Sequence, residues 1–111
     1  MGAPRRSIRD AVTVPCFVRV REFLWPDERL AHVARHQVRP EEVEEACFGA
    51  ALVQRARSKG PNPVYYVLGQ TEAGRYLLCI VVEFPDDRGY PVTARDMTEA
   101  ERRRYLRWLK R

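Results

Sequence analysis

Residues 64–95 read VYYVLGQTEAGRYLLCIVVEFPDDRGYPVTAR, and this stretch decides the fold. In its first part, residues 64–69, the side-chain pattern alternates between the two faces of a half-buried strand. Residues 75–84 contain an apolar run rich in β-branched side chains, as a central strand would. Residues 90–95 are short enough for a third strand, and the two intervening segments have turn composition. The stretch therefore predicts three consecutive strands joined by tight turns, with polar and basic residues at their ends.

A strand and two helices are predicted ahead of this stretch. The first strand is expected at residues 16–24. Pro26 lies in the first turn of the first helix, followed by acidic residues at its positive end, and the helix ends near His36. Pro40 begins the second helix in the same way, and a further strand is expected at residues 50–57. Apolar spacing predicts one apolar face on the first helix, made of Leu30, Val33 and Ala34. On the second helix it predicts a buried face made of Val43, Ala46 and Cys47.

A last helix follows the strands. Thr98 and Glu101 form a capping box, in which each side chain accepts from the backbone amide of the other residue. We expect an inner stripe made of these side chains: Tyr105, Leu106 and Leu109. The predicted class is α+β: a small antiparallel β-meander packed by two N-terminal-side helices and one C-terminal helix. Residues 16–111 form the single domain, and residues 1–15 form a flexible arm with at most a short strand near 12–14.

Composition indicates one ordinary cytoplasmic domain. The chain has 111 residues, 45% of them hydrophobic, which is enough for one core. Its three cysteines, Cys16, Cys47 and Cys79, lie far apart, so buried reduced thiols are expected rather than disulfides or a zinc site. The longest apolar run is too short to cross a bilayer, and the first residues lack the apolar segment of a signal peptide.

The positive charge is concentrated at the two ends of the chain. The net charge is +5, from 20 basic and 15 acidic residues. Residues 1–21 carry five Arg and one Asp, and residues 95–111 carry seven basic and three acidic residues, so each segment is +4. Eighteen of the twenty basic residues are Arg, which binds phosphate and carboxylate with two parallel hydrogen bonds. An acidic partner, either nucleic acid or an acidic protein, is one explanation, and a genome whose codons favour Arg is another.

His32 and His36 are the only histidines, and their i, i+4 spacing places them on one face of a helix. A metal pair would need a third ligand, and the sequence marks none, so we predict neither a metal nor a cofactor. His36 at the helix end is suited to act as a general base or as a hydrogen-bond donor to a phosphate. Alternatively, it bonds the last carbonyls of the helix.

Two arginines mark the ends of neighbouring strands. Arg75 precedes the central strand and Arg95 ends the next one, so antiparallel pairing would bring both to one edge of the sheet. Two converging guanidinium groups would form a phosphate site. The alternative is a pair of surface arginines, with Arg95 bonded to Asp96 or Glu99.

Three segments together resemble the BrnT-type toxin family. Residues 25–28 (WPDE) with 34–38 (ARHQV) are similar to its "W-D-E…K-H-G-V" opening. Residues 66–75 (YVLGQTEAGR) are similar to its "Y-x-x-x-G-R-T-x-x-G-R" segment. Residues 92–105 (VTARDMTEAERRRY) are similar to "I-S-A-R-x-A-T-x-x-E-R-x-x-Y". The resemblance covers roughly residues 20–108, nearly the whole chain apart from the arm.

The resemblance implies a RelE-like fold and a metal-independent ribonuclease that acts as the toxin of a type II toxin–antitoxin pair. The implied antitoxin is a ribbon-helix-helix protein. The functional positions carried over are His36, Arg75 and Arg95. The RNA 2′-hydroxyl would attack the adjacent phosphate, with the two arginines stabilising the transition state and His36 moving a proton. Arg35 would assist His36, and Gln70 would orient a phosphate oxygen.

The chain departs from the family pattern at three positions. Gln70 stands where many members have Arg, Arg35 replaces the usual Lys, and Gln37 replaces a Gly. Two alternatives therefore stay open beside the enzyme. One is a catalytically inactive BrnT-like module that binds RNA or protein, and the other is a chain that has kept antitoxin binding without enzymatic activity. Self-association is compatible with all three.

Overall fold

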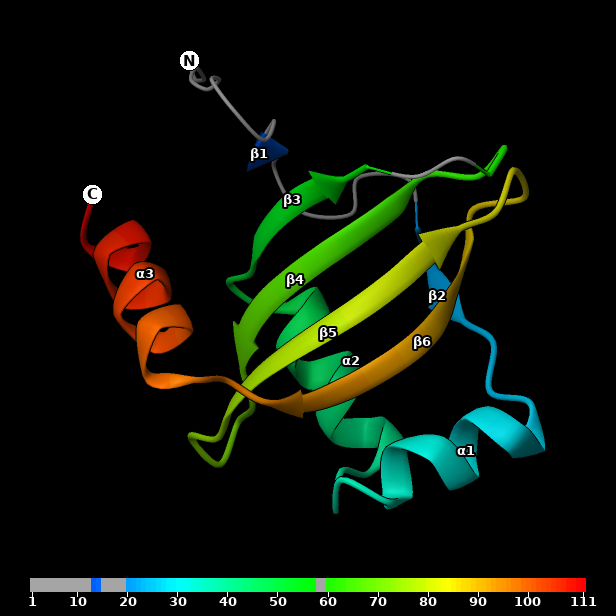
Figure 1. Cartoon of the computed structure of the whole chain (residues 1–111), viewed down its shortest axis with the longest axis horizontal. Coiled ribbons are helices and arrows are strands. Elements are labelled where there is room, and N and C mark those ends of the chain that lie inside the picture. The colour runs from blue at the N-terminus through cyan, green and yellow to red at the C-terminus, as the bar shows by residue number, and fades with distance from the viewer. Residues whose placement is uncertain (1–12, 15–19, 58–59) are drawn as a thin grey trace.

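The sheet is mixed, with six strands in the order β1-β3-β4-β5-β6-β2 (Figure 1). This count holds for residues 13–14, 20–57 and 60–111, which the computed structural model describes. The strands are β1 (Thr13–Val14), β2 (Glu22–Phe23), β3 (Leu52–Ala56), β4 (Val64–Gln70), β5 (Tyr76–Glu83) and β6 (Arg88–Asp96). The helices are α1 (Asp27–Ala34), α2 (Pro40–Phe48) and α3 (Glu99–Lys110).

The predicted α+β class is confirmed, and strands form at the four predicted places from residue 50 to residue 95. Neighbours among β3, β4, β5 and β6 run antiparallel. The sheet as a whole is not antiparallel, because β2 pairs in parallel with the start of β6.

The N-terminal predictions are only partly testable. Of the strand predicted at residues 16–24, only Glu22–Phe23 is a strand, and residues 16–19 lie outside the described part. The predicted arm also lies outside it, apart from the pair of residues in β1, which is antiparallel to β3.

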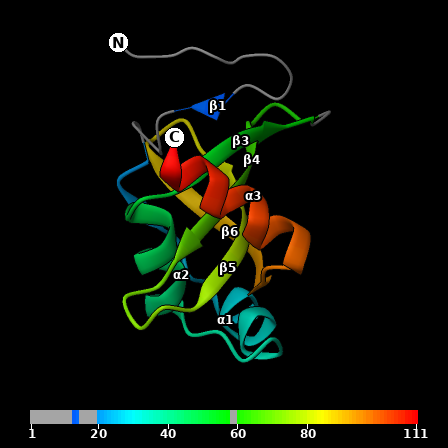
Figure 2. The same cartoon turned by 90° about the vertical axis from the view of Figure 1, so that its left-hand side faces the viewer.

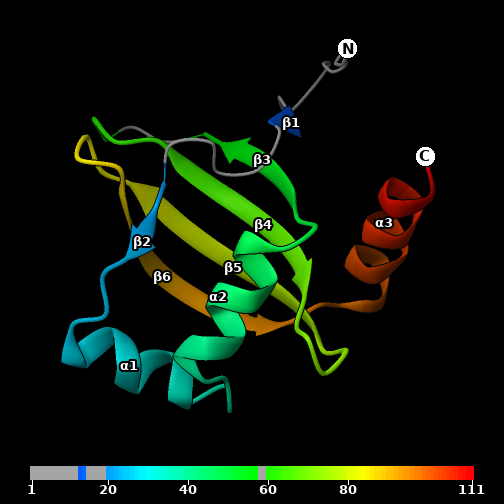
Figure 3. The same cartoon turned by 180° about the vertical axis from the view of Figure 1, so that it is seen from behind.

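The two faces of the sheet carry different cores. On the rear face, Leu77, Cys79 and Val81 of β5 pack with α1 and α2 in the larger core (Figure 3). On the front face, Leu78 packs under Tyr105 of α3 in a smaller core. Successive side chains of a strand point to opposite faces, so the alternation along β5 fills both cores. Figure 2, viewed from the side, shows α2 and α3 on opposite sides of the sheet.

Helix α2 lies directly on the backbone of β4. A Cβ atom added to Gly69 would lie 2.1 Å from the carbonyl oxygen of Ala46, which is closer than any real contact. Val43, Ala46 and Cys47 form the buried face of α2, as predicted. The glycine allows the helix to approach closely enough to bury that face completely.

Helix α1 ends in a Schellman motif. The amide of Val38 donates to the carbonyl of Val33, and the amide of Gln37 donates to that of Ala34. Gln37 has a φ of 59°, the left-handed conformation that glycine usually supplies at this position. The buried side chains of Val33 and Val38 complete the motif. The helix end therefore has the ordinary shape even though a glutamine stands there.

Strand β6 carries a bulge that accommodates its proline. The register shifts between Ile80 and Val81 on β5, so that Thr93 and Pro91 are their partners and Val92 is the extra residue. The freed carbonyl of Val92 accepts a hydrogen bond from Arg29 of α1 at 2.6 Å. Proline lacks an amide donor, and bulges on outer strands are where a sheet tolerates it.

The predicted capping box of α3 is confirmed. The Thr98 hydroxyl accepts from the Glu101 amide at 3.2 Å, and the Glu101 carboxylate accepts from the Thr98 amide at 2.8 Å. Tyr105 is buried, and its hydroxyl donates to the carbonyl of Ala50. The inner stripe is wrong at one position, because Leu109 is 39% exposed and Trp108 packs on the front core in its place.

Cys47 and Cys79 are buried free thiols of the rear core, as expected, while Cys16 lies outside the described residues. Burial raises the pKa of Cys47, and the neighbouring Cys79 adds to the effect. Within the described part of the chain, no helix has the length and apolar character needed to cross a membrane.

Candidate functional site

Arg75 and Arg95 lie at the same end of the sheet but on opposite faces. Arg95 pairs with Leu78, whose side chain belongs to the front core. Arg75 precedes β5 by one residue and is in phase with Leu77, which belongs to the rear core. The sequence argument places both at one edge correctly, but the alternation of β5 separates the two guanidinium groups.

Arg75 holds the end of α1 against the sheet. Its Nη1 donates to the carbonyl of Gln37 at 2.7 Å, and its Nη2 donates to the carbonyl of His36 at 3.3 Å. Its Nε binds Asp96 at 2.7 Å, and Nη1 also lies 3.2 Å from a carboxylate oxygen of Glu42. The last carbonyls of a helix lack partners within it and carry partial negative charge, so an arginine is well suited to them.

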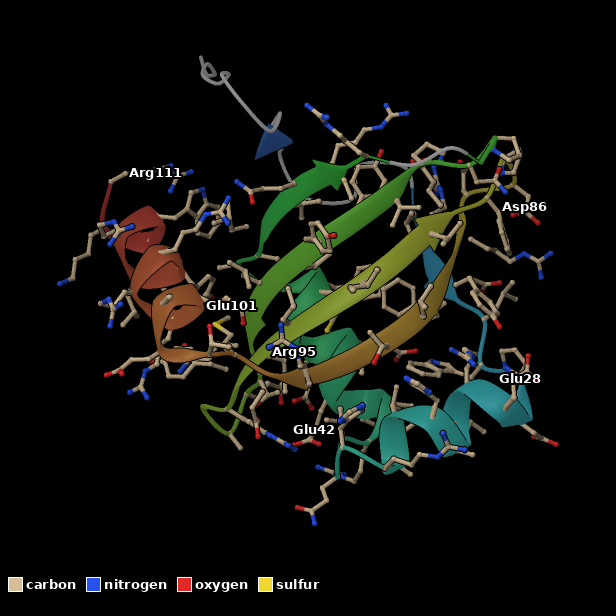
Figure 4. The ribbon with its side chains drawn as sticks, viewed as in Figure 1. Glu28, Glu42, Asp86, Arg95, Glu101 and Arg111 are labelled. Carbon is tan, nitrogen blue, oxygen red and sulfur yellow. The ribbon has the colours of Figure 1, made fainter. Side chains whose placement is uncertain are left out.

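Arg95 is on the front face, beside the first turn of α3 (Figure 4). Its Nη1 and Nη2 bind the two carboxylate oxygens of Glu101, each at 3.0 Å, and Nη1 also donates to the carbonyl of Asp96. The hydrogen bond from Arg95 lowers the pKa of Glu101, with smaller contributions from Thr98. The sequence suggested Asp96 or Glu99 as the partner of Arg95. Asp96 contributes only its backbone carbonyl, Glu99 pairs with Arg103 instead, and the carboxylate that binds Arg95 is that of Glu101.

The two histidines lie together beside the outer edge of β6. The ring centroids of His32 and His36 are 5.7 Å apart, edge to face. Nε2 of His32 is 3.0 Å from the hydroxyl of Thr93, which precedes Arg95 by two residues on the same face of β6. Burial lowers the pKa of His32, and the nearby positive charges of Arg29 and Arg35 lower it further. These effects favour the neutral form of His32, which is the form that accepts a proton.

Arg35 and Gln70 take different positions around this site. Arg35 is exposed at the C-terminal end of α1, and its backbone amide donates to carbonyls of the preceding turn. The side-chain amide of Gln70 donates to the carbonyl of Gly74 at 3.1 Å, across the turn between β4 and β5. Gln70 therefore stabilises the turn that directly precedes Arg75.

Sequence reasoning missed two residues of this site. The sequence indicates Glu101 only as part of the capping box, and its pairing with Arg95 follows once α3 folds back beside β6. The sequence marked His32 only as half of a metal pair. Its contact with Thr93 depends on the packing of α1 against β6, which no local pattern reveals. Among residues 20–57 and 60–111, no three His, Cys, Asp or Glu side chains are grouped as a metal ion would require.

The chain matches no protein-family model, and no curated protein is similar enough in sequence to match it. The arrangement of Arg95, Glu101 and the two histidines therefore has to be interpreted from its own chemistry.

Proposed function

We propose that this chain is a metal-independent ribonuclease toxin of the BrnT type, with a RelE-like fold, that acts in a type II toxin–antitoxin pair. The observation that carries the proposal is the position of Arg95. Its guanidinium group lies on the front face, and His32 contacts Thr93 two residues earlier on the same strand. A cation and an imidazole on neighbouring parts of one strand can supply charge stabilisation and proton transfer, the two contributions that RNA cleavage without a metal requires.

In the proposed reaction, the RNA 2′-hydroxyl attacks the adjacent phosphorus atom and the bond from phosphorus to the 5′ oxygen breaks. The products are a 2′,3′-cyclic phosphate and a 5′-hydroxyl. The histidine pair takes the proton of the attacking hydroxyl, with His36 as the exposed member and His32 as the member that contacts β6. The leaving 5′ oxygen takes a proton from the imidazolium so formed. Arg95 stabilises the negative charge that builds up on the phosphate oxygens.

The other carried-over residues have supporting roles in this proposal. Arg35, exposed beside His36, contributes positive charge near the RNA backbone, and Gln70 is a neutral contact to a neighbouring phosphate. Arg75 acts through its contacts with α1, because its hydrogen bonds fix the turn that carries His36. A ribbon-helix-helix antitoxin would block this face.

The deciding experiment is expression of the chain without any partner. Wild type should arrest growth and Arg95→Ala should not, because loss of one charge-stabilising donor lowers the rate of cleavage about a hundredfold or more. Arg88→Ala is the matched control, since Arg88 lies at the other end of β6 and pairs with exposed Asp86. Purified wild type that leaves RNA intact, or an Arg95→Ala variant that cuts RNA equally well, overturns the proposal.

A second candidate is a catalytically inactive module that binds RNA or protein. The observation that favours it is the carboxylate of Glu101, which neutralises Arg95 in the isolated chain. Such a module would bind RNA with steep salt dependence and would not cleave it. Growth arrest by wild type argues against it.

A further inference from the structure

The front face of the sheet is covered by α3 only at one end. The covered row of paired residues runs across four strands as Leu52, Leu68, Leu78 and Arg95. Two further rows, which we call the open rows, follow on the same face. They are Gln54, Tyr66, Ile80 and Thr93, and then Ala56, Val64, Val82 and Tyr90. Figure 1 shows that no described helix crosses this part of the face.

Tyr66 lies in the middle of the open rows and is 45% exposed. Its neighbours across the strands are Gln54 and Ile80, both only half-buried. An aromatic ring exposed at the centre of a sheet costs free energy in water, because apolar area that could be buried stays hydrated. Contiguous exposed apolar surface, rather than one exposed residue, marks interaction sites. Tyr66 is contiguous with the half-buried apolar side chains of Ile80 and Val64 in the open rows.

The charges around the open rows fit a polyanion. In the three rows of paired residues, Arg95 is the only charged side chain. Two carboxylates from outside the rows contact their ends: that of Glu101 pairs with Arg95, and that of Glu28 accepts a hydrogen bond from the Tyr90 hydroxyl. At the border with α3, the guanidinium carbon of Arg102 lies 4.7 Å from the ring centroid of Tyr76. The chain from residue 95 onward carries a net charge of +4. An exposed aromatic ring bordered by arginines offers a base both stacking and charge, as single-stranded nucleic-acid sites do.

We propose that Tyr66 is a stacking platform for an unpaired base of single-stranded RNA whose backbone phosphate lies at Arg95. The inference rests on the proposed function for the identity of the ligand as RNA. Tyr66 lies two strands and one row from Arg95, which the spacings of a sheet put at about 12 Å between Cα atoms. One strand of RNA can therefore contact both. A duplex cannot, because its bases are stacked on each other and their faces are covered.

The test measures binding of a labelled 2′-O-methyl RNA of about 12 nucleotides by fluorescence anisotropy, since a 2′-O-methyl group cannot attack the phosphate. Tyr66→Ala should weaken binding roughly tenfold to a hundredfold, the range expected for loss of one base–aromatic stack. Tyr66→Phe keeps the ring and should bind within about twofold of wild type. Leu109→Ala removes an apolar side chain of similar exposure from α3 and should leave binding unchanged. Thermal unfolding of each variant confirms that the fold is retained.

Two further probes separate stacking from general attraction to phosphate. An oligonucleotide of the same length with abasic sites should bind wild type as weakly as the intact probe binds Tyr66→Ala. A duplex of the same sequence should bind more weakly than the single strand. Equal binding of wild type and Tyr66→Ala, or preference for the duplex, overturns the inference.

The two proposals can fail separately. Tyr66-dependent binding of RNA that wild type never cleaves would support the platform and reject the ribonuclease. Cleavage of unmodified RNA by wild type, with unchanged binding and rate in Tyr66→Ala, would support the ribonuclease and reject the platform. An acidic protein that binds at the open rows while single-stranded RNA does not would also reject the platform.

Discussion

Arg95 and Glu101 form a bidentate pair, in which Nη1 donates to Oε1 and Nη2 donates to Oε2, each at 3.0 Å. The same carboxylate closes the capping box of α3 through the amide of Thr98. One side chain thus fixes the start of α3 and neutralises the best-placed cation of the front face. Any phosphate that binds Arg95 has to compete with it.

Glu101→Gln should make Arg95 more available to RNA. Glutamine keeps the capping box, since its side-chain oxygen accepts from the same amide, but it removes the ion pair. RNA affinity should rise about two- to fivefold, the value expected for a partly exposed ion pair. The measurement is a titration at several salt concentrations. Glu99→Gln, in the same turn but with an exposed carboxylate, is the control, and equal affinities of the two variants contradict the prediction.

The pairing also predicts how stability depends on pH. The pKa of Glu101 is lower in the folded state than in the unfolded chain, where it is about 4.3. Between the folded and unfolded pKa values of Glu101, the unfolded chain therefore binds more protons than the folded chain. The stability that the Arg95–Glu101 pair contributes is lost progressively as the pH falls below about 4.5. Urea unfolding at pH 7 and pH 3.5 should show a smaller loss for Glu101→Gln than for wild type. An equal loss in both would mean that other carboxylates cause it.

Arg75→Ala should destabilise the fold rather than remove a catalytic group alone. Arg75 is 26% exposed and bonds two carbonyls at the end of α1 as well as Asp96. Losing these charged hydrogen bonds should lower the free energy of unfolding by about 2–3 kcal/mol, measured by urea denaturation. Arg88→Ala, which breaks only an exposed pair with Asp86, should cost less than about 1 kcal/mol. A stable but inactive Arg75→Ala variant would instead indicate direct contact with substrate.

Gln37→Gly should stabilise the chain. Gln37 has a φ of 59°, which costs a residue with a Cβ atom about 1 kcal/mol and costs glycine almost nothing. The added flexibility of the unfolded chain offsets part of this gain, so a rise of about 0.5–1 kcal/mol is expected. Arg35→Gly, two residues earlier, is the control, because Arg35 has the ordinary helical φ of −62° and should lose stability. A decrease for Gln37→Gly would show that its side chain makes a contact worth more than the strain.

The sequence predicts local features of this fold better than long-range ones. The capping box at Thr98 and the buried face of α2 follow from patterns within one helix, and both are confirmed. The contact of Arg75 with Gln37 joins residues 38 positions apart, so no local pattern could predict it. For Trp108 and Leu109, both apolar, the rotation of α3 on the sheet decides which is buried, and helical spacing leaves that open.

The candidate site shows the same limit. Strand order predicts correctly that Arg75 and Arg95 reach one end of the sheet. Whether they share a face depends on the number of residues between Arg75 and the start of β5 and on the register of β5 with β6, in which Leu78 pairs with Arg95. A register shift of one residue would have placed Arg75 and Arg95 on the same face.

The way α1 contacts β6 has a consequence for how larger assemblies can form. The bulge on β6 leaves the carbonyl of Val92 pointing outward, where Arg29 occupies it, and His32 occupies the neighbouring hydroxyl of Thr93. A strand of another molecule could pair with β6 only after displacing these two side chains and β2. This edge is thereby protected against strand-to-strand aggregation. Recruitment of another protein through β6 is accordingly directed onto the face of the sheet.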